Sequence, residues 1–257
     1  MIGMLIFPFL VCVALVLVHA YFGAFVLRRG IIFIDLALAQ WAALGYIAGY
    51  LMGVHEPLLL FLIGFGFTVL ASLVLTLLKP IYQENNLQEA VIGVTYITAT
   101  ALSIAMVSMA GLEGHHIQEM LTGHLLFVQP SEVWMAVGLY ALIGCVLLKL
   151  HPYFIQPQGQ KWDFVFYVLF GLVVTSSVKM VGVLLVFSYL VLPILSVVQS
   201  YDSFRSQVKV GWVIGVLSSM LGLWVSFFLD VPPSVAVILV LVLAWVCSMG
   251  LRFLFRT

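Results

Sequence analysis

The segment RRGIIFIDLALAQWAALGYIAGYLMG, residues 28–53, carries the pattern that decides the fold prediction. Two basic residues, Arg28 and Arg29, precede an apolar run that is long enough to cross a membrane, since a transmembrane helix needs about 20 apolar residues. One carboxylate, Asp35, lies near the start of this run. An ionisable group inside a membrane span is costly to insert, so Asp35 is a candidate functional residue.

The composition indicates a membrane protein with helical spans. Of the 257 residues, 64% are hydrophobic and only 8% are charged, whereas a soluble domain usually carries about 25% charged residues. The apolar runs are long and continuous, while the strands of a membrane barrel alternate over about 10 residues. We therefore predict an all-α, polytopic transmembrane bundle that forms a single domain over residues 1–257. The formal net charge of zero gives no electrostatic argument for binding nucleic acid.

The runs that could cross the membrane lie at 2–27, 31–53, 57–78, 90–110, 132–150, 163–199, 210–229 and 234–254. The run 163–199 would form a helix of about 55 Å, which is too long for one crossing of a hydrocarbon core of about 30 Å. A break near TSSVKM, residues 175–180, would divide it into two spans, of which the first is short. The sequence thus predicts about nine spans, with eight or ten as alternatives.

The basic residues predict the orientation of the chain. With the N-terminus outside and the C-terminus in the cytoplasm, all of the ten lysine and arginine residues except Lys179 fall on the inner side, as the positive-inside rule expects. The outer connections instead carry acidic residues and histidines. This distribution suits an incoming cation, although ordinary solvated loop charges explain it equally well.

Glycines recur at every fourth position in the second half of the opening segment, at Gly45, Gly49 and Gly53. This spacing places them on one helix face, where small residues let helix backbones approach closely in lipid. Close helix packing is therefore the favoured interpretation, and the lining of a narrow path is the alternative.

Asp35 lies about one turn into the second predicted helix, near the inner interface. It could form a salt bridge with Arg28 or Arg29, be stabilised by the helix dipole at this N-terminus, or contact a cation on the exit side of a path. Gln40 lies one or two turns deeper and could offer its carbonyl oxygen to a passing hydrated ion. These two residues form the inner candidate metal site.

The segment GLEGHHIQEMLTGHLLF, residues 111–127, concentrates imidazole and carboxylate groups on the predicted outer side. Histidine together with carboxylate suits zinc, manganese or iron better than calcium or magnesium. A transit site must release its ion, so an incomplete ligand set is compatible with transport, and a solvated loop rich in histidine is the alternative. The candidate ligands are Glu113, His115, His116, Glu119 and His124.

Five segments together resemble the membrane permease subunit of metal-ion ABC importers, the family for zinc, manganese and iron. The strongest, VKMVGVLLVFSYLVLPILSV (178–197), is similar to the family's Lys or Gln, then Val-Gly-x-Leu-Leu-Val, then a span ending in proline and small residues. FFLDVPPSVAVILV (227–240) resembles its Asp-x-Pro turn, EAVIGVTYITATALSIAMVS (89–108) its acid-Ala-Ile-Gly-Ile span, and LTGHLLFVQPSEV (121–133) its Phe-Gly-x-Leu-Leu-x-Val-Ser segment. The opening segment resembles its second span, and the family's order is kept along nearly the whole chain.

The opening segment departs from the second span of the family, which usually contains Gly-Asp-x-x-x-His. Asp35 stands in place of the glycine, Leu36 in place of the acid, and Gln40 in place of the histidine. The imidazole, a common ligand of zinc, is therefore missing. This departure bears on the identity of the cargo more than on the class of transporter.

The resemblance implies a fold like that of type II ABC importers and a subunit that makes and breaks no bond. The chain has no GxxxxGK[ST] motif and cannot hydrolyse ATP by that route, so a separate P-loop ATPase subunit is implied. The segment HPYFIQPQGQKW (151–162) is expected to contact this ATPase. The candidate contact residues are His151, Pro152, Tyr153, Gln156, Gly159 and Lys161, and Gly182 and Pro193 join the three glycines as expected helix-packing residues.

The implied assembly places a divalent transition metal, as cargo, in a path between two copies of the chain in a prokaryotic inner membrane. An extracytoplasmic metal-binding protein delivers the ion, membrane lipid surrounds the spans, and no cofactor is bound permanently. One alternative is an ABC permease for a metal chelate such as a siderophore, haem or cobalamin. The others are a gradient-driven transporter with Asp35 as its proton site and a membrane scaffold without transport activity.

Overall fold

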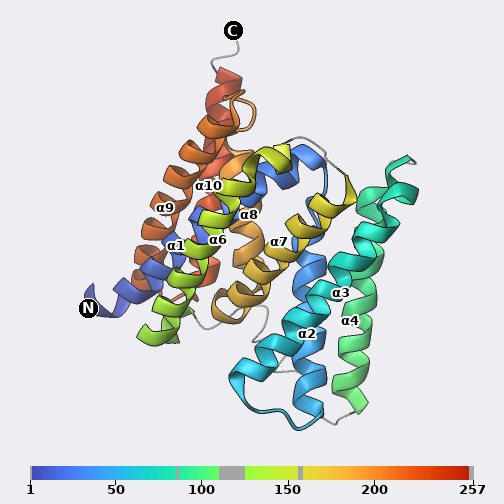
Figure 1. Ribbon diagram of the computed structural model, residues 1–257. Coiled ribbons are helices and arrows are strands. Elements are labelled where there is room, and N and C mark those ends of the chain that lie inside the picture. Colours follow the sequence, from blue (N-terminus) through green and yellow to red (C-terminus); the bar gives the residue numbers. More distant parts are fainter. Residues whose placement is uncertain (1, 85–86, 110–124, 156–158, 255–257) are drawn as a thin grey trace. The chain divides into compact units, whose positions relative to one another are not determined.

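The computed structural model describes residues 2–84, 87–109, 125–155 and 159–254, and every regular element in these ranges is helical (Figure 1). Nine α-helices and one short 3-10 helix, η1, are found in this part of the chain. Their bounds are α1 Ile2–Arg29, α2 Ile34–Leu51, α3 Pro57–Glu84, α4 Gln88–Met109, η1 Leu125–Phe127, α6 Pro130–Ile155, α7 Gln160–Val181, α8 Val183–Leu195, α9 Phe204–Leu229 and α10 Pro233–Leu254.

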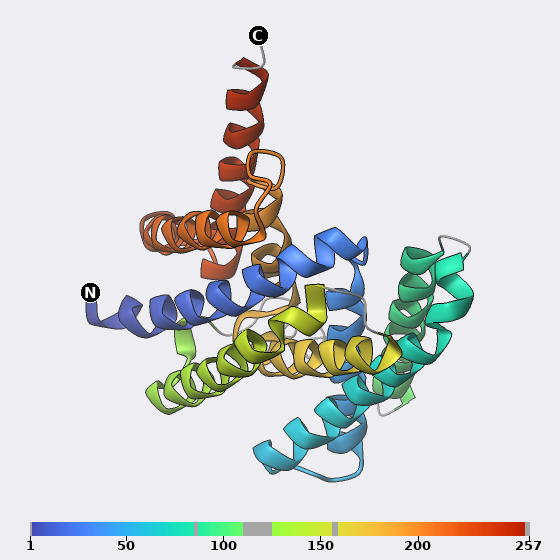
Figure 2. The same ribbon diagram turned by 45° about the horizontal axis from the view of Figure 1, so that its top comes forward.

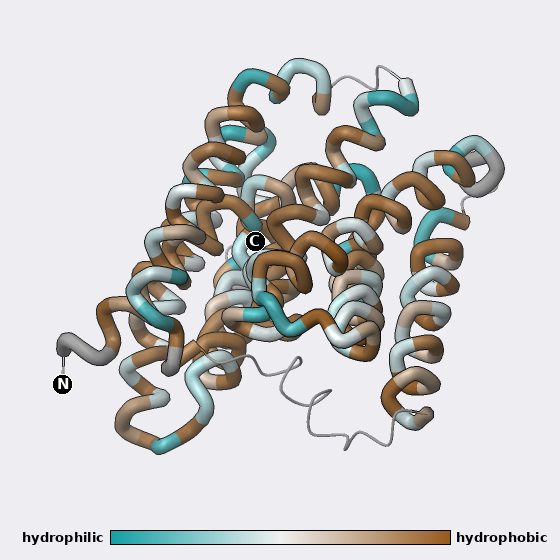
Figure 3. Tube along the Cα trace, turned by 60° about the horizontal axis from the view of Figure 1, so that its bottom comes forward, coloured by the Kyte–Doolittle hydropathy of each residue, from teal (hydrophilic) through white to brown (hydrophobic). Residues whose placement is uncertain are grey.

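Eight of these helices are long and apolar enough to cross a membrane, and α8, with 13 residues, is the shorter ninth. Hydrophobic residues cover most of their length in Figure 3, as expected for helices that meet lipid on one side and other helices on the other. The prediction of an all-α transmembrane bundle is thereby confirmed.

The break within the run 163–199 lies at Gly182, so its predicted position at residues 175–180 was wrong. Ser176 and Ser177 lie within α7, where their hydroxyls are satisfied by donating to the carbonyl oxygen of Val173 and so need no break in the helix. Gly182 instead adopts φ 81°, a left-handed conformation that glycine accepts at little cost. The second helix, α8, is therefore the short one, and Pro193 lies inside it near its C-terminal end.

The chain divides into two compact units. Unit 1 comprises Met1–Arg28, Leu121–Gly144 and Met180–Thr257, and unit 2 comprises Arg29–Met120 and Cys145–Lys179. Each unit is described by itself below. The single domain over residues 1–257 stays a prediction.

In unit 2, α2 packs against α3 and α4, and the three helices lie side by side in Figures 1 and 2. A Cβ added at Gly45 would lie 2.7 Å from the Cα of Gly64 in α3, so the two backbones are in close contact. Gly49 also faces α3, where a Cβ would meet the side chains of Leu60 and Ile63. Gly53 lies beyond the end of α2 with φ 82° and open space around it, which fits a turn rather than a packing contact.

In unit 1, the short helix α8 is tightly enclosed. Gly23 of α1 approaches the backbone of Leu190 so closely that a Cβ there would overlap its carbonyl oxygen. On α9, the Ser219 hydroxyl lies 2.7 Å from the Tyr189 hydroxyl of α8, and both residues are fully buried. Because lipid removes the hydrophobic drive for helix association, such close contacts and buried hydrogen bonds hold the helices together.

The helix ends of unit 1 are joined by two arginines. Arg28, near the end of α1, donates to Oε1 of Gln207 in the first turn of α9 at 3.0 Å. Arg252, in the last turn of α10, donates to the carbonyl oxygen of Ser196, which follows α8, at 2.6 Å. These contacts and the chain direction place the start of α1 and the end of α10 at opposite ends of unit 1.

Replacing Thr175 with valine is expected to destabilise unit 2 only slightly. The Thr68 hydroxyl donates to the Gly64 carbonyl at 2.8 Å, so it accepts the hydrogen bond that Thr175 offers across the α3–α7 contact at 2.8 Å. The change removes one interhelical hydrogen bond and leaves the Thr68 donor satisfied, so we expect a loss of about 0.6 kcal/mol. Thermal unfolding of the detergent-solubilised protein measures it.

The matched control is Thr98→Val. The exposed Thr98 hydroxyl bonds only within its own helix, to the Val94 carbonyl at 2.8 Å. An equal loss of stability in both variants would show that the Thr68–Thr175 hydrogen bond contributes nothing to the contact between α3 and α7.

Candidate functional site

The candidate ion site is built around the start of α2. Gly30, with φ 64°, turns the chain after α1, and the amide of Ile34 bonds to the Ile31 carbonyl at 3.2 Å. The amide of Ile32 donates to Oε1 of Glu89, in the first turn of α4, at 2.6 Å. This support fixes the short connection between α1 and α2 and so sets the position of Asp35 in the first turn of α2.

Asp35 is fully buried, and neither of its carboxylate oxygens has a hydrogen-bond donor among the described residues. The salt bridge with Arg28 or Arg29 is not formed, because Arg28 binds Gln207 and Arg29 binds Asp163 and the Phe154 carbonyl. A helix N-terminus still favours the carboxylate, but this effect is worth no more than about 2 kcal/mol. An unpaired buried charge costs several kcal/mol, so Asp35 destabilises the fold unless it binds a cation or a proton.

Gln40, the second inner candidate, is half-buried on α2. The five-residue spacing from Asp35 separates the two side chains by about 140° around the helix axis, so they do not share a face. Its contact with a passing ion stays a prediction.

Glu89 is a candidate that the sequence analysis did not single out. While its Oε1 accepts from Ile32, its buried Oε2 has no hydrogen-bond partner in the described ranges. It thus holds the backbone three residues before Asp35 and keeps one acceptor unused. The signal in the sequence was an acid at the start of an apolar run, the same signal that marked Asp35.

The outer candidate ligands Glu113, His115, His116, Glu119 and His124 lie outside the described residues, so their predicted role is untested. Gln156 also falls outside them. Within the described ranges, no group of three or more His, Cys, Asp and Glu side chains could hold a metal ion. A metal ion at Asp35 would therefore have fewer than three such side chains as ligands in these ranges.

The segment expected to contact an ATPase connects α6 to α7. His151, Pro152 and Tyr153 lie in the last turns of α6, and Lys161 is exposed at the start of α7. Gly159 adopts φ 99° just before α7 begins.

The two sides of this connection are held together by aromatic contacts. The rings of Tyr153 and Trp162 stack with their centroids 4.2 Å apart, and those of Phe154 and Phe166 meet edge to face at 5.5 Å. The described ends of the connection therefore form one packed element.

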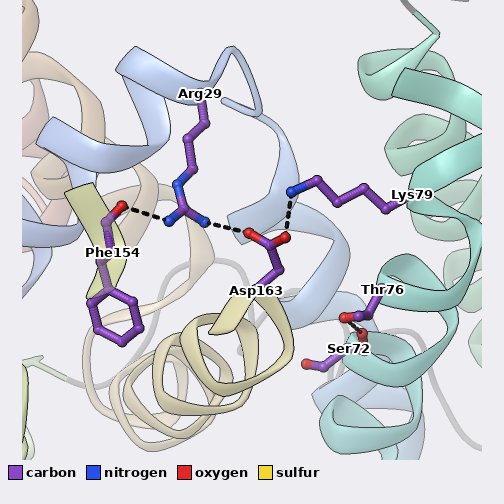
Figure 4. Close-up of polar contacts among 6 residues, drawn as sticks. All are labelled: Arg29, Ser72, Thr76, Lys79, Phe154 and Asp163. Atoms are coloured by element: carbon purple, nitrogen blue, oxygen red, sulfur yellow. Dashed lines mark hydrogen bonds and ion pairs between the residues drawn. The ribbon is translucent and has the colours of Figure 1, made fainter. Parts of the chain in front are cut away.

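A charged cluster, formed by Arg29, Lys79 and Asp163, lies against this element (Figure 4). Asp163, in the first turn of α7, accepts from Nη1 of Arg29 at 3.1 Å through Oδ1 and from Nζ of Lys79 through Oδ2. Nη2 of Arg29 donates to the Phe154 carbonyl at the end of α6 at 3.0 Å, and its guanidinium lies 4.3 Å from the centre of the Phe166 ring. One carboxylate thus joins Arg29, α3 and α7 within unit 2.

The chain is similar to known proteins over most of its length. The sequence profile of the ABC 3 transport family matches residues 1–252. The chain is 24% identical over 241 residues to the manganese import system permease protein ScaB of Streptococcus gordonii, covering 88% of this chain and 83% of that protein. It is 25% identical over 240 residues to the manganese transport system membrane protein MntC of Listeria monocytogenes, covering 87% and 82%.

Two further similarities extend the comparison. The chelated iron transport system membrane protein YfeC of Yersinia pestis is 24% identical over 226 residues, covering 83% of this chain and 74% of that protein. Among solved structures, PsaBC from Streptococcus pneumoniae in complex with Fab matches with a TM-score of 0.78 and 20% identity, over 95% of this chain and 90% of that chain. This last similarity concerns the fold.

Proposed function

Because the chain belongs to the ABC 3 transport family, we propose that it is the membrane-spanning permease subunit of an ATP-driven importer for a divalent transition-metal ion. The family match over nearly the whole chain is the observation that carries this proposal. In this role the chain forms the path and catalyses no reaction, and a separate P-loop ATPase subunit hydrolyses ATP.

Manganese is the favoured cargo, with iron second. ScaB and MntC, from two different genera, are named for manganese, and YfeC is named for chelated iron. The second helix offers the carboxylate oxygens of Asp35 and contains no histidine. Oxygen ligands suit manganese, whereas zinc favours imidazole and thiolate, so the residues of α2 favour manganese over zinc.

The proposed orientation has the N-terminus outside and the C-terminus in the cytoplasm of a prokaryotic cell. The positive-inside rule favours it, because this orientation assigns all lysine and arginine residues except Lys179 to the inner side. The start of α1 and the end of α10 lie at opposite ends of unit 1. Arg29, Lys79 and Asp163, which the sequence assigns to the same side, meet in one cluster.

The proposed transport cycle uses two copies of the chain and two ATPase subunits. An extracytoplasmic binding protein releases the ion into a path between the copies. The Asp35 carboxylate, buried within one copy and without a partner among the described residues, supplies the charge that offsets lost hydration once α2 moves and exposes it to this path. ATP hydrolysis moves the connection between α6 and α7, and the path opens to the cytoplasm.

The test is to co-express the chain with a P-loop ATPase subunit from the same organism and to reconstitute the complex in liposomes. Uptake of manganese, iron and zinc is then measured with ATP and with a non-hydrolysable analogue. We expect ATP-dependent uptake of manganese that exceeds uptake of zinc and is unchanged by a proton uncoupler.

Three outcomes would contradict the proposal. An ATPase that does not co-purify, with no uptake of any metal, would favour a scaffold. Uptake that an uncoupler abolishes while ATP is maintained would indicate a gradient-driven transporter. Stimulation of ATP hydrolysis by a siderophore or haem but by no free metal would indicate a chelate importer.

A further inference from the structure

The charged cluster of Arg29, Lys79 and Asp163 has no role in binding the cargo by itself, because its carboxylate is already paired. Both oxygens of Asp163 are occupied, one by each cation. The side chains are largely buried, with exposed fractions of 21% for Arg29, 20% for Lys79 and 11% for Asp163. A carboxylate that binds two cations from different segments fixes their position, because separating a largely buried pair leaves a charge without compensation.

Arg29 contacts both sides of the connection between α6 and α7. It donates to the Phe154 carbonyl at the end of α6, and it contacts Asp163 and the Phe166 ring at the start of α7. Tyr153 and Trp162 close the same element by stacking. A displacement of this element therefore acts on the Arg29 guanidinium from two directions.

Arg29 is also the last residue of α1, six positions before Asp35. Gly30, in the left-handed conformation, follows it, and Ile32 is held by Glu89 of α4. The connection between Arg29 and the first turn of α2 is short and fixed in its middle. A shift of Arg29 is thus passed to the helix turn that carries Asp35 rather than absorbed by a long loop.

We propose that Asp163 is the positioning residue that couples movement of the α6–α7 connection to the first turn of α2, and so couples ATP hydrolysis to opening of the site at Asp35. This inference rests on the proposed function. While Arg29 is paired with Asp163, the first turn of α2 is held in the position seen in this structure. Release of Arg29 from Asp163 lets this turn move to a second position, in which the site at Asp35 is open. Coupling of this kind needs an element with two discrete arrangements. Here the two arrangements are the Arg29–Asp163 ion pair formed and the same pair broken.

The experiment uses the reconstituted complex with its ATPase and compares wild type with Asp163→Asn. Metal uptake and ATP hydrolysis are measured in the same preparation, and their ratio is the readout. We expect Asp163→Asn to keep ATP hydrolysis within about twofold of wild type while the manganese transported per ATP falls about fivefold. Asp163→Glu, which keeps the charge, is expected to restore most of the ratio.

Asp202→Asn is the matched control. Asp202 is exposed in the connection between α8 and α9, and only its backbone oxygen accepts a hydrogen bond, from Arg28 at 3.5 Å. The Asp202→Asn substitution removes the same charge without breaking an ion pair of the cluster. We therefore expect the amount of manganese transported per ATP to be unchanged.

A wild-type ratio in Asp163→Asn would overturn the inference, as would a parallel fall of uptake and hydrolysis, which indicates a structural role. If Asp163→Asn does not accumulate in the membrane, Arg29→Gln is used, because it breaks the Arg29–Asp163 pair while Lys79 still neutralises Asp163. A ratio lowered about twofold then supports the inference and an unchanged ratio overturns it. The proposed function fails separately, by the absence of ATP-dependent uptake in the wild-type complex.

Discussion

Replacing Asp35 with asparagine is expected to stop metal transport while leaving the protein folded and at least as stable as wild type. Both carboxylate oxygens of Asp35 are buried without a hydrogen-bond donor in the described part of the chain, so the charged group opposes folding. Asparagine has the same shape and carries no charge. The change therefore removes a destabilising charge and, with it, the anion that an incoming metal ion needs.

The expected loss of uptake is large. Loss of a residue that merely supports a metal ligand lowers affinity about 10- to 100-fold, and loss of a charged ligand costs at least as much. We therefore expect manganese uptake by Asp35→Asn to fall about 100-fold, with the unfolding temperature unchanged or raised. Uptake is measured in liposomes containing the complex, and stability is measured on the same detergent-solubilised protein.

The opposite directions of the two effects separate a functional role from a structural one. A residue retained for packing would lower stability and transport together when it is changed. Asp202→Asn, at an exposed carboxylate, is the control for a general effect of lost negative charge. Uptake by Asp35→Asn at the wild-type level would remove Asp35 from the proposed path, whatever its effect on stability.

The helices could be predicted from the sequence because lipid imposes their length and composition. The spans at 57–78 and 90–110, for example, correspond to α3 and α4. The break between α7 and α8 could not be predicted correctly from polarity. Ser176 and Ser177 resemble a polar interruption, but their hydroxyls bond to a carbonyl of the same helix, whereas the backbone conformation of Gly182 ends it.

The candidate site could be predicted only where a single residue carried the signal. Asp35 stands out as an acid in an apolar run, and the structure shows in addition that its carboxylate has no hydrogen-bond partner among the residues described. In the sequence Asp163 marks only the start of the apolar run 163–199. Its two partners are 134 and 84 residues away, so no local pattern reveals the cluster. The contact between the Glu89 carboxylate and the Ile32 amide could not be predicted for the same reason, because it depends on how α4 packs beside α2.

Replacing Gly23 with alanine is expected to destabilise the protein more than the same replacement at any other described glycine. The added Cβ would overlap the carbonyl oxygen of Leu190 and lie 2.9 Å from its carbonyl carbon. These are backbone atoms inside α8, so no side-chain rotation relieves the contact, and α1 must move away from α8. Small-to-large changes in tight contacts usually cost about 1–3 kcal/mol, and a backbone collision belongs at or above the upper end of that range.

We therefore expect Gly23→Ala to lose about 3 kcal/mol or more of stability, which shows as a lower unfolding temperature and a smaller folded fraction in size-exclusion chromatography. Gly66→Ala in α3 is the matched control, because beyond the neighbouring backbone of its own helix no atom of the described residues lies within 4 Å of the added Cβ. Alanine also favours a helix by up to about 1 kcal/mol over glycine. The two variants should shift stability in opposite directions. Equal stability of both would show that α1 and α8 are not in backbone contact, and the enclosure of the short helix would then have to rest on the Tyr189–Ser219 hydrogen bond and side-chain packing alone.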